Sequence, residues 1–240
     1  MARSVKLQFG AGAAFCELPS PVAAVRCLLS LKRAGNMSLG ERERRAAFFQ
    51  SLGIPPGRVL AVRQVHSLRV VAAGQIPPGQ PPEADGILAA DPEAVLTVTV
   101  ADCLPLFVVD RRTGARGLLH SGWKGTGIVA EAIGRMAALY GSRPADLSVL
   151  IGPGIGSCCY DVPRERFELF RDRFGRGSAE ERGGRTYLDL RRANVGLLAD
   201  SGVEDVTVAA DCTACTPELA SYRALGSAGY IGMVAVMGSF

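Results

Sequence analysis

Residues 96–125, LTVTVADCLPLFVVDRRTGARGLLHSGWKG, contain the segments that decide how this chain folds. Two apolar runs, 95–101 and 106–109, lie on either side of an Asp-Cys pair, and a turn at Thr113-Gly114 leads into a third run at 116–120. Continuous apolar runs of this length are typical of strands that are buried on both faces. The stretch therefore predicts neighbouring strands at the centre of a packed sheet.

Strands and helices alternate irregularly along the rest of the chain. Periodicity and end residues predict helices at 41–52, 126–140, 163–174 and 189–202, with Thr126 and Asp189 as caps. Further strands are expected at 5–9, 22–31, 58–66, 68–73, 87–89, 147–152, 206–209 and 230–237. We expect 68–73 to pair with 58–66, and we expect 176–184, which is polar and glycine-rich, to be a mobile loop. The pattern favours an α+β fold, a compact single-domain sandwich of mixed β-sheet with flanking helices, over residues 1–240.

Composition excludes several classes of protein. Hydrophobic residues make up 48% of the chain and charged residues 21%, as in a packed globular protein. The net charge is only +4 and the basic residues are scattered, so we expect no nucleic-acid partner. The chain has no apolar run long enough to span a membrane and no apolar core of a signal peptide, which favours a cytoplasmic protein without a membrane partner.

Three residues form the leading candidate for a metal site. The chain has only two histidines, His66 and His120, and each ends a strand-like run, as Cys103 does. Two imidazoles, one thiolate and an open fourth position are the arrangement of catalytic zinc. We therefore expect these three residues to hold one metal ion at the mouth of a sheet, although two satisfied histidines and a buried cysteine would also explain them.

Other polar residues are weaker candidates. Gln64, Lys124, Arg223 and Arg45 are candidates for contact with substrate, and Asp85 is a candidate for supporting the site. We expect Asp102, which precedes Cys103, to be structural. Cys158 and Cys159 are expected to be core thiols in a loop, because adjacent cysteines cannot easily bind one ion together. The Cys-x-x-Cys pair, Cys212 and Cys215, is expected to be structural or incidental, because no second such pair completes it.

Six segments in this order resemble the laccase-domain family, also called YfiH-like or multicopper polyphenol oxidoreductase-like. They are the QVH, ADCLP, HSGWKG, GPGIGSCCYDV, LDL and SYR segments at 64–66, 101–105, 120–125, 152–162, 188–190 and 221–223. The resemblance extends from about Asn36 to Met237. It implies a compact α+β sandwich and a metal held by His66, Cys103 and His120.

The same resemblance implies a zinc-dependent purine nucleoside phosphorylase, which cleaves nucleosides with phosphate to a free base and ribose 1-phosphate. Members of the family are also credited with hydrolytic deamination of adenosine and with cleavage of methylthioadenosine. The chain departs from the family pattern at Ser121 and Lys124 in HAGWRG, at Ala224 after SYR, and at Tyr230, where a TGR segment would end. Ser121 replaces an alanine and the other three replace arginines, although Lys124 keeps the charge and loses only the planar fork. If the family's arginines bind phosphate or base, these departures call phosphorolysis by this chain into question.

Three alternatives remain at this stage. The older family name implies copper-dependent oxidation of phenols, although multi-copper oxidation needs many histidine ligands and this chain has two. Cys103 could instead be the nucleophile of a cysteine hydrolase, with His120 as its base. A binding module without turnover is the third alternative.

Overall fold

Strand β8 (Leu104–Asp110) is buried along its whole length in the computed structural model, which describes residues 2–20 and 22–240. Its side chains alternate between two cores. Leu106 and Val108 belong to a core that includes residues of the helices, whereas Phe107 and Val109 belong to a core shared with a second sheet. The apolar run is continuous because both faces of this strand are covered.

The larger sheet has seven strands in the order β1-β14-β10-β8-β9-β6-β5. The β10-β8, β8-β9 and β9-β6 pairs are antiparallel, and the other three pairs are parallel. Besides β8, its members are β1 (Arg3–Val5), β5 (Val70–Ala72), β6 (Gly86–Ala89), β9 (Arg116–Ser121), β10 (Leu147–Ile151) and β14 (Asp205–Ala209).

The second sheet has five strands in the order β2-β3-β15-β7-β4. Its members are β2 (Phe15–Leu18), β3 (Arg26–Ser30), β15 (Met233–Gly238), β7 (Val95–Val100) and β4 (Val59–Ala61). In β15, Ala235 and Met237 face the core between the two sheets, whereas Val234 and Val236 face a third core.

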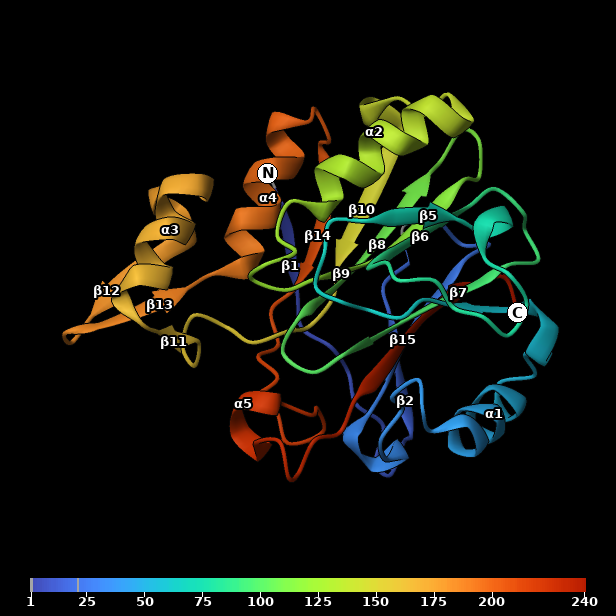
Figure 1. The fold of residues 1–240 in the computed structure, drawn as a ribbon, viewed down its shortest axis with the longest axis horizontal. Coiled ribbons are helices and arrows are strands. Elements are labelled where there is room, and N and C mark those ends of the chain that lie inside the picture. Colours follow the sequence, from blue (N-terminus) through green and yellow to red (C-terminus); the bar gives the residue numbers. More distant parts are fainter. Residues whose placement is uncertain (1, 21) are drawn as a thin grey trace.

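Helices cover the outer faces of the two sheets (Figure 1). Helices α2 (Ile128–Tyr140) and α4 (Leu190–Asp200) pack on the seven-stranded sheet, and α1 (Arg42–Ser51) packs through Phe48 and Phe49 on the five-stranded sheet. The layers are therefore helices, sheet, sheet and helix. The expected α+β class, with mixed β-sheet and flanking helices, is confirmed.

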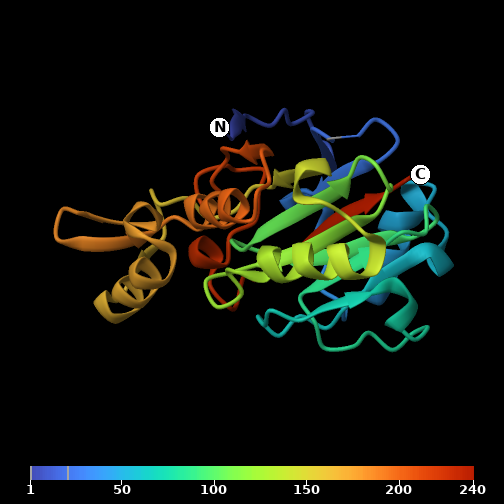
Figure 2. The same cartoon turned by 90° about the horizontal axis from the view of Figure 1, so that it is seen from above.

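A small third sheet and α3 (Arg164–Phe174) project from this body in both ribbon views (Figures 1 and 2). The sheet has the order β11-β13-β12, with β11 (Asp161–Val162), β12 (Ala179–Arg182) and β13 (Arg185–Leu188). The expectation of a mobile loop at 176–184 was wrong, because 179–182 pairs with 185–188 in an antiparallel hairpin. Gly183 and Gly184, both with positive φ, make its turn.

The expected strand at 58–66 is much shorter, and its expected pairing was wrong. Strand β4 ends at Ala61 and pairs in parallel with β7, whereas β5 pairs with β6. The cause lies in the buried carboxylate of Asp85, which accepts the backbone amides of Val65, His66 and Ser67. These amides are thereby withdrawn from any strand ladder, so the chain turns into a loop.

One helix cap was predicted correctly and one was not. The side chain of Asp189 accepts the amide of Arg192 and caps α4, as expected. The Thr126 hydroxyl instead donates to the carbonyl of Gly122, and α2 begins after Gly127, whose φ is 115°. Thr126 therefore stabilises the turn that follows His120 rather than the helix.

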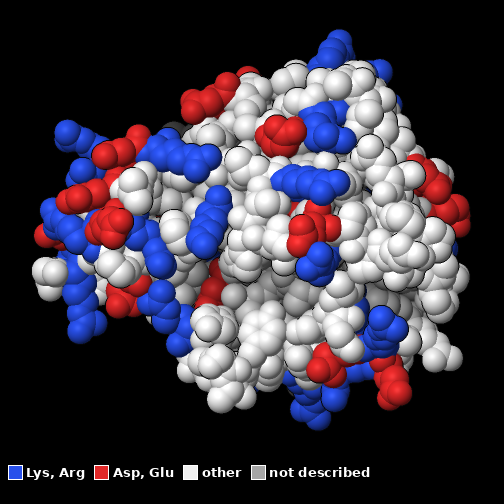
Figure 3. All heavy atoms as spheres, viewed as in Figure 1, with Lys and Arg blue, Asp and Glu red and all other residues white. Residues whose placement is uncertain are grey.

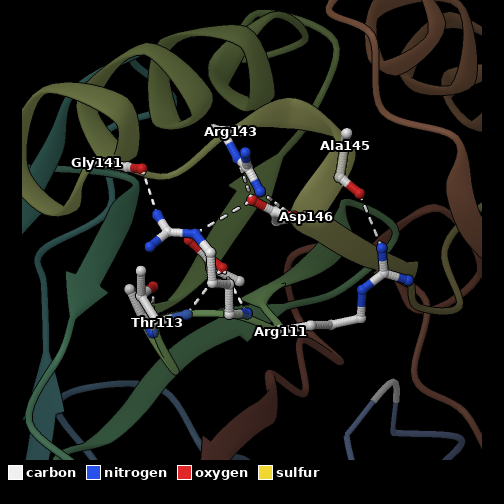
Figure 4. A network of polar contacts seen from close by, with 9 residues as sticks. Arg111, Thr113, Gly141, Arg143, Ala145 and Asp146 are labelled. Carbon is white, nitrogen blue, oxygen red and sulfur yellow. Dashed lines mark hydrogen bonds and ion pairs between the residues drawn. The ribbon is translucent and has the colours of Figure 1, made fainter.

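Surface ion pairs join the β8–β9 turn to the connection between α2 and β10 (Figure 4). The carboxylate of Asp146 accepts from Arg143 at 2.6 Å and from Arg112 at 3.3 Å. Arg111 donates to the carbonyl of Ala145 at 2.8 Å, and Arg112 donates to that of Gly141 at 2.6 Å. The network lies away from the residues predicted for the site.

Candidate metal centre and binding cavity

His66 is placed by the loop that Asp85 organises. The backbone of His66 is left-handed, with φ of 59°, and its amide donates to Oδ1 of Asp85 at 3.0 Å. A non-glycine residue in this conformation is uncommon and needs such support. Burial raises the pKa of Asp85, but hydrogen bonds from His120 and Ser67 outweigh it and hold that pKa at about 2.

His120 lies in β9 and is buried. Its Nδ1 atom is 2.8 Å from Oδ1 of Asp85, which leaves Nε2 as the nitrogen available to a ligand. Burial lowers the pKa of His120, but the negative charge of Cys103 and the hydrogen bond to Asp85 raise it to about 9.

Cys103 lies in the short connection between β7 and β8. Asp102, with φ of 83°, fixes this connection because its carboxylate accepts the Thr213 hydroxyl at 2.6 Å and the Arg223 amide at 2.7 Å. These contacts support the structural role expected for Asp102. Burial raises the pKa of the Cys103 thiol, but the two histidines outweigh it and lower that pKa to about 6.

The three predicted ligand residues come together from three separate segments. One ligand atom from each of His66, Cys103 and His120 lies within 4.8 Å of the other two. A Cβ atom added to Gly122 would lie 2.7 Å from Cys103 Sγ and 3.5 Å from His66 Cδ2, so this glycine leaves room for the cluster. Two imidazoles and a thiol of low pKa are a donor set that fits zinc, and the group could hold a metal ion.

A cavity of about 640 Å³ opens over this cluster, which is within the range for small-molecule sites. All three ligand residues line it. Aromatic rings and arginines make up much of the remaining wall, from Arg63, Trp123, Tyr160, Arg166, Tyr222, Arg223 and Tyr230. The site thus combines a metal-binding group with flat apolar surfaces and cations.

The four candidates for contact with substrate occupy different places. Gln64 and Arg223 line the cavity, although the Gln64 amide is also engaged with the backbone of Thr99. Arg45 is buried in α1 and donates to the carbonyl of Met37. Lys124 lies beside the Trp123 ring and is exposed. Neither Arg45 nor Lys124 is among the residues that line the cavity, so neither is retained as a contact.

Sequence analysis missed Arg166 and Tyr160. Arg166 comes from α3, its guanidinium lies 4.3 Å from the centre of the Trp123 ring, and no carboxylate pairs with it in the described part of the chain. In contrast, Arg223 pairs with Asp161 and Arg63 pairs with Glu83. Burial and the charge of Cys103 raise the pKa of Tyr160 to about 12, against the opposing effect of the two arginines.

Charges of both signs are mixed over the face seen in Figure 3. They are densest where α3 and the β12–β13 hairpin project, and ion pairs such as Arg164–Glu168 and Arg182–Glu180 occur there. No described helix is long and apolar enough to cross a membrane.

The four remaining candidate cysteines also gather in one place. Cys158 and Cys215 are exposed, Cys159 is partly exposed and only Cys212 is buried, so the expectation of core thiols was wrong for the first pair. All seven cysteines of the chain are free. Cys212 and Cys215 were expected to be structural or incidental because no second Cys-x-x-Cys pair occurs. In the structure, the sulfur atoms of Cys158 and Cys159 lie close to those of Cys212 and Cys215.

The model of a known family, described as multi-copper polyphenol oxidoreductase laccase, matches residues 36–238. The chain belongs to this family. A protein named purine nucleoside phosphorylase from Deinococcus radiodurans is 36% identical over 188 residues, which cover 75% of this chain and 70% of that protein. A protein of the same name from Mycobacterium tuberculosis is 32% identical over 181 residues, covering 75% and 72%.

The fold of this laccase-family chain also matches solved structures. The crystal structure of YlmD from Geobacillus stearothermophilus superposes with a TM-score of 0.87 at 27% identity, covering 97% of this chain and 98% of that one. The family resemblance seen in the sequence is thereby confirmed, and the relatives' names indicate an enzyme that acts on nucleosides.

Proposed function

We propose that this chain is a zinc-dependent purine nucleoside phosphorylase. The observation that carries the proposal is the cavity in which the His66, Cys103 and His120 cluster faces aromatic rings and an unpaired arginine. The names of the relatives support the same class of reaction. Adenosine, inosine, guanosine and methylthioadenosine are the proposed substrates.

His66, Cys103 and His120 would hold the zinc ion, one per chain at this site. When bound there, zinc supplies a Lewis acid that stabilises negative charge developing on oxygen. Asp85 fixes the ring of His120 through Nδ1 and the backbone of His66 through its amide, so one carboxylate orients two of the three ligands.

The aromatic side chains would bind the purine. Trp123 and Tyr160 lie on the cavity, and Tyr222 and Tyr230 form an edge-to-face pair with ring centres 6.2 Å apart. Flat rings offer stacking surface to a purine and exclude water from the bond that breaks. Tyr230, where the family pattern has an arginine, therefore adds surface for the base in place of a charge.

Arg166 would bind phosphate. Its planar guanidinium can donate two parallel hydrogen bonds to phosphate oxygens, and it has no competing carboxylate in the described chain. Arg223 supplies a second positive charge at the cavity but shares it with Asp161 at 2.6 Å. These two residues would supply the planar guanidinium that is lost at Lys124 and the positive charge that is lost at Ala224.

In this reaction an oxygen of phosphate forms a bond to C1′ of the ribose while the bond from C1′ to the purine nitrogen breaks. The electron pair of that bond leaves with the base, which takes up a proton. The same site is proposed to deaminate adenosine as a side activity, in which water adds at C6 and ammonia leaves.

The test is release of hypoxanthine from inosine, measured with and without phosphate. Turnover that requires phosphate, yields ribose 1-phosphate and is lost in Cys103→Ala and in zinc-depleted protein supports the proposal. Turnover independent of phosphate would show hydrolysis, and no cleavage of any of the four nucleosides by zinc-loaded protein would refute it.

A second candidate is a cysteine hydrolase. Cys103 and His120 lie together, and the charge of each helps to lower the pKa of the thiol to about 6 and to raise that of the imidazole to about 9. Such a shift favours the thiolate–imidazolium pair of an activated cysteine nucleophile. Inactivation of a metal-free, catalytically competent preparation by a thiol alkylator would favour this candidate. Copper oxidation of phenols is the weaker rival, because two histidines cannot build a multi-copper centre.

A further inference from the structure

Four cysteines from two distant loops meet in one group. Cys158 and Cys159 follow strand β10, and Cys212 and Cys215 follow strand β14. Their four sulfur atoms all lie within 4.8 Å of one another. None of the four lines the cavity, so this group is separate from the site described above.

The sulfur spacing corresponds to four ligands around one ion. Zinc–sulfur bonds of about 2.3 Å in a tetrahedron place the sulfur atoms about 3.8 Å apart. The Sγ atom of Cys215 lies 3.8 Å from that of Cys158 and 3.3 Å from that of Cys159. A disulfide would bring two sulfur atoms to about 2.05 Å. Four thiolates in a tetrahedron are typical of zinc and of iron–sulfur sites, and sulfur atoms this close together suit a single ion rather than a cluster.

Local backbone structure explains how adjacent cysteines share one site. Residues 157–159 form a turn in which the amides of Cys159 and Tyr160 both donate to the carbonyl of Gly156. Successive side chains in a helical turn are about 100° apart, rather than on opposite sides as in a strand. The expectation that adjacent cysteines cannot easily bind one ion together therefore does not apply to this turn.

The second pair has the same kind of support. The amides of Cys215 and Thr216 donate to the carbonyl of Cys212 at 3.1 and 3.0 Å, which folds the Cys-x-x-Cys segment into a tight turn. The amide of Gly156 donates to Cys212 Sγ at 3.2 Å. An amide aimed at sulfur stabilises the thiolate form that a metal requires.

The two loops are held together without a metal, so the ligands are in place before binding. The amide of Thr213 donates to the carbonyl of Gly154 at 3.1 Å, and Arg191 donates to the same carbonyl at 2.8 Å. A Cβ atom added to Gly156 would lie 3.1 Å from Cys158 Sγ and 3.4 Å from the Arg191 guanidinium. This half-buried cation partly offsets the net negative charge of four thiolates around a divalent ion.

We propose that Cys158, Cys159, Cys212 and Cys215 bind a second zinc ion in a closed, four-coordinate structural site. With four protein ligands the ion has no open position, so its role is to fix the loops. Those loops contact Asp102 through the amide of Ile155 at 2.8 Å and the hydroxyl of Thr213 at 2.6 Å. The second zinc would therefore stabilise the wall of the cavity next to Cys103.

The experiment measures zinc per chain by elemental mass spectrometry in protein purified without chelator or added metal. Wild-type protein is expected to hold about two zinc ions, Cys103→Ala about one, Cys215→Ser about one, and the double variant about none. Cys16→Ala, which removes a buried cysteine of β2 that belongs to neither group, is the matched control and should keep the wild-type content.

Two further measurements keep the test decisive. If Cys215→Ser does not fold, apo Cys103→Ala titrated with Zn²⁺ alone must still bind one ion per chain. Thiol titration of denatured wild-type protein with chelator and without reductant must find seven thiols. A titration that finds five or three thiols would show one or two disulfides and would overturn the proposal. An unchanged zinc content in folded Cys215→Ser protein would also overturn it. If only the His66, Cys103 and His120 site fails to bind zinc, wild-type protein and Cys103→Ala would both hold about one zinc ion per chain, and Cys215→Ser would hold none.

Discussion

Asp85 Oδ1 lies 2.8 Å from Nδ1 of His120, and the same carboxylate accepts hydrogen bonds from the backbone amides of the loop that carries His66. Asp85 directly precedes strand β6, His120 lies in strand β9, and His66 lies in the loop after β4. One fully buried side chain thus couples two ligand residues that are 54 positions apart (120 − 66).

Replacing Asp85 by Asn should weaken zinc binding at the first site by about 10–100-fold, because outer-shell partners of a metal-bound histidine contribute about that much. A chelator competition assay measures the change. Asp200→Asn, an exposed change at the end of α4, is the control and should behave as wild type. Equal zinc affinity in the two variants would contradict the role given to Asp85.

Gly122→Ala should displace the cluster. The added Cβ would lie 2.7 Å from Cys103 Sγ, closer than any carbon and sulfur atom can pack, so Cys103 must shift. We expect loss of zinc from the first site and of turnover. Gly134→Ala makes the same change inside α2, where nothing lies within 4 Å, and should leave zinc content unchanged and raise stability by up to about 1 kcal/mol. Normal zinc content in Gly122→Ala would show that the cluster tolerates the methyl group.

Arg166→Ala should raise the KM for phosphate by about 10–100-fold, since a hydrogen bond to a charged group contributes about 1.5–3 kcal/mol. Arg166→Lys should restore only part of the loss, because lysine lacks the planar fork. Arg171→Ala removes a charge from the same helix but not from the cavity, and is the matched control. The assignment fails if KM for phosphate is unchanged while KM for the nucleoside rises.

Asp146→Asn tests the surface network of Figure 4. The hydrogen bond from Arg143 lowers the pKa of Asp146 below its usual value. A carboxylate whose pKa is lower in the folded state stabilises the fold at every pH above its pKa in the unfolded chain, which is near 3.9. This stabilisation is lost as the pH falls through the pKa of the folded state.

The wild type should therefore unfold at a slightly higher temperature than Asp146→Asn at pH 7. The difference should shrink in high salt and vanish in strong acid. Thermal unfolding from pH 7 to pH 2 measures it. A difference in unfolding temperature that grows as the pH falls would contradict the lowered pKa of Asp146. Glu43→Gln, on an exposed face of α1, is the control for the loss of one carboxylate.

Sequence patterns located the strands that build the core because those strands are buried on both faces. The run at 95–101 became β7 and the run at 116–120 became β9, close to the expected bounds. The candidate ligands were found because two histidines in the whole chain left few choices. His120 lies near the end of β9 and Cys103 follows β7, whereas His66 lies in a loop rather than at the end of the expected strand.

Most of the features that sequence analysis failed to predict depend on contacts between residues far apart in the chain. The strand expected through His66 fails because Asp85, 19 residues later, accepts its backbone amides. Arg166 escaped notice because nothing in its helix distinguishes it from Arg164 or Arg171; only the packing of α3 brings it over Trp123. The four-cysteine group was missed because it needs β10 and β14 to be neighbours in the sheet.

The most direct test of the central claim is zinc content measured beside phosphate-dependent inosine cleavage, in wild-type protein and in Cys103→Ala. The account predicts that the variant loses about one zinc per chain and all phosphorolysis, while Cys16→Ala keeps both. Full phosphate-dependent cleavage by Cys103→Ala, or by wild-type protein stripped of zinc, would contradict it.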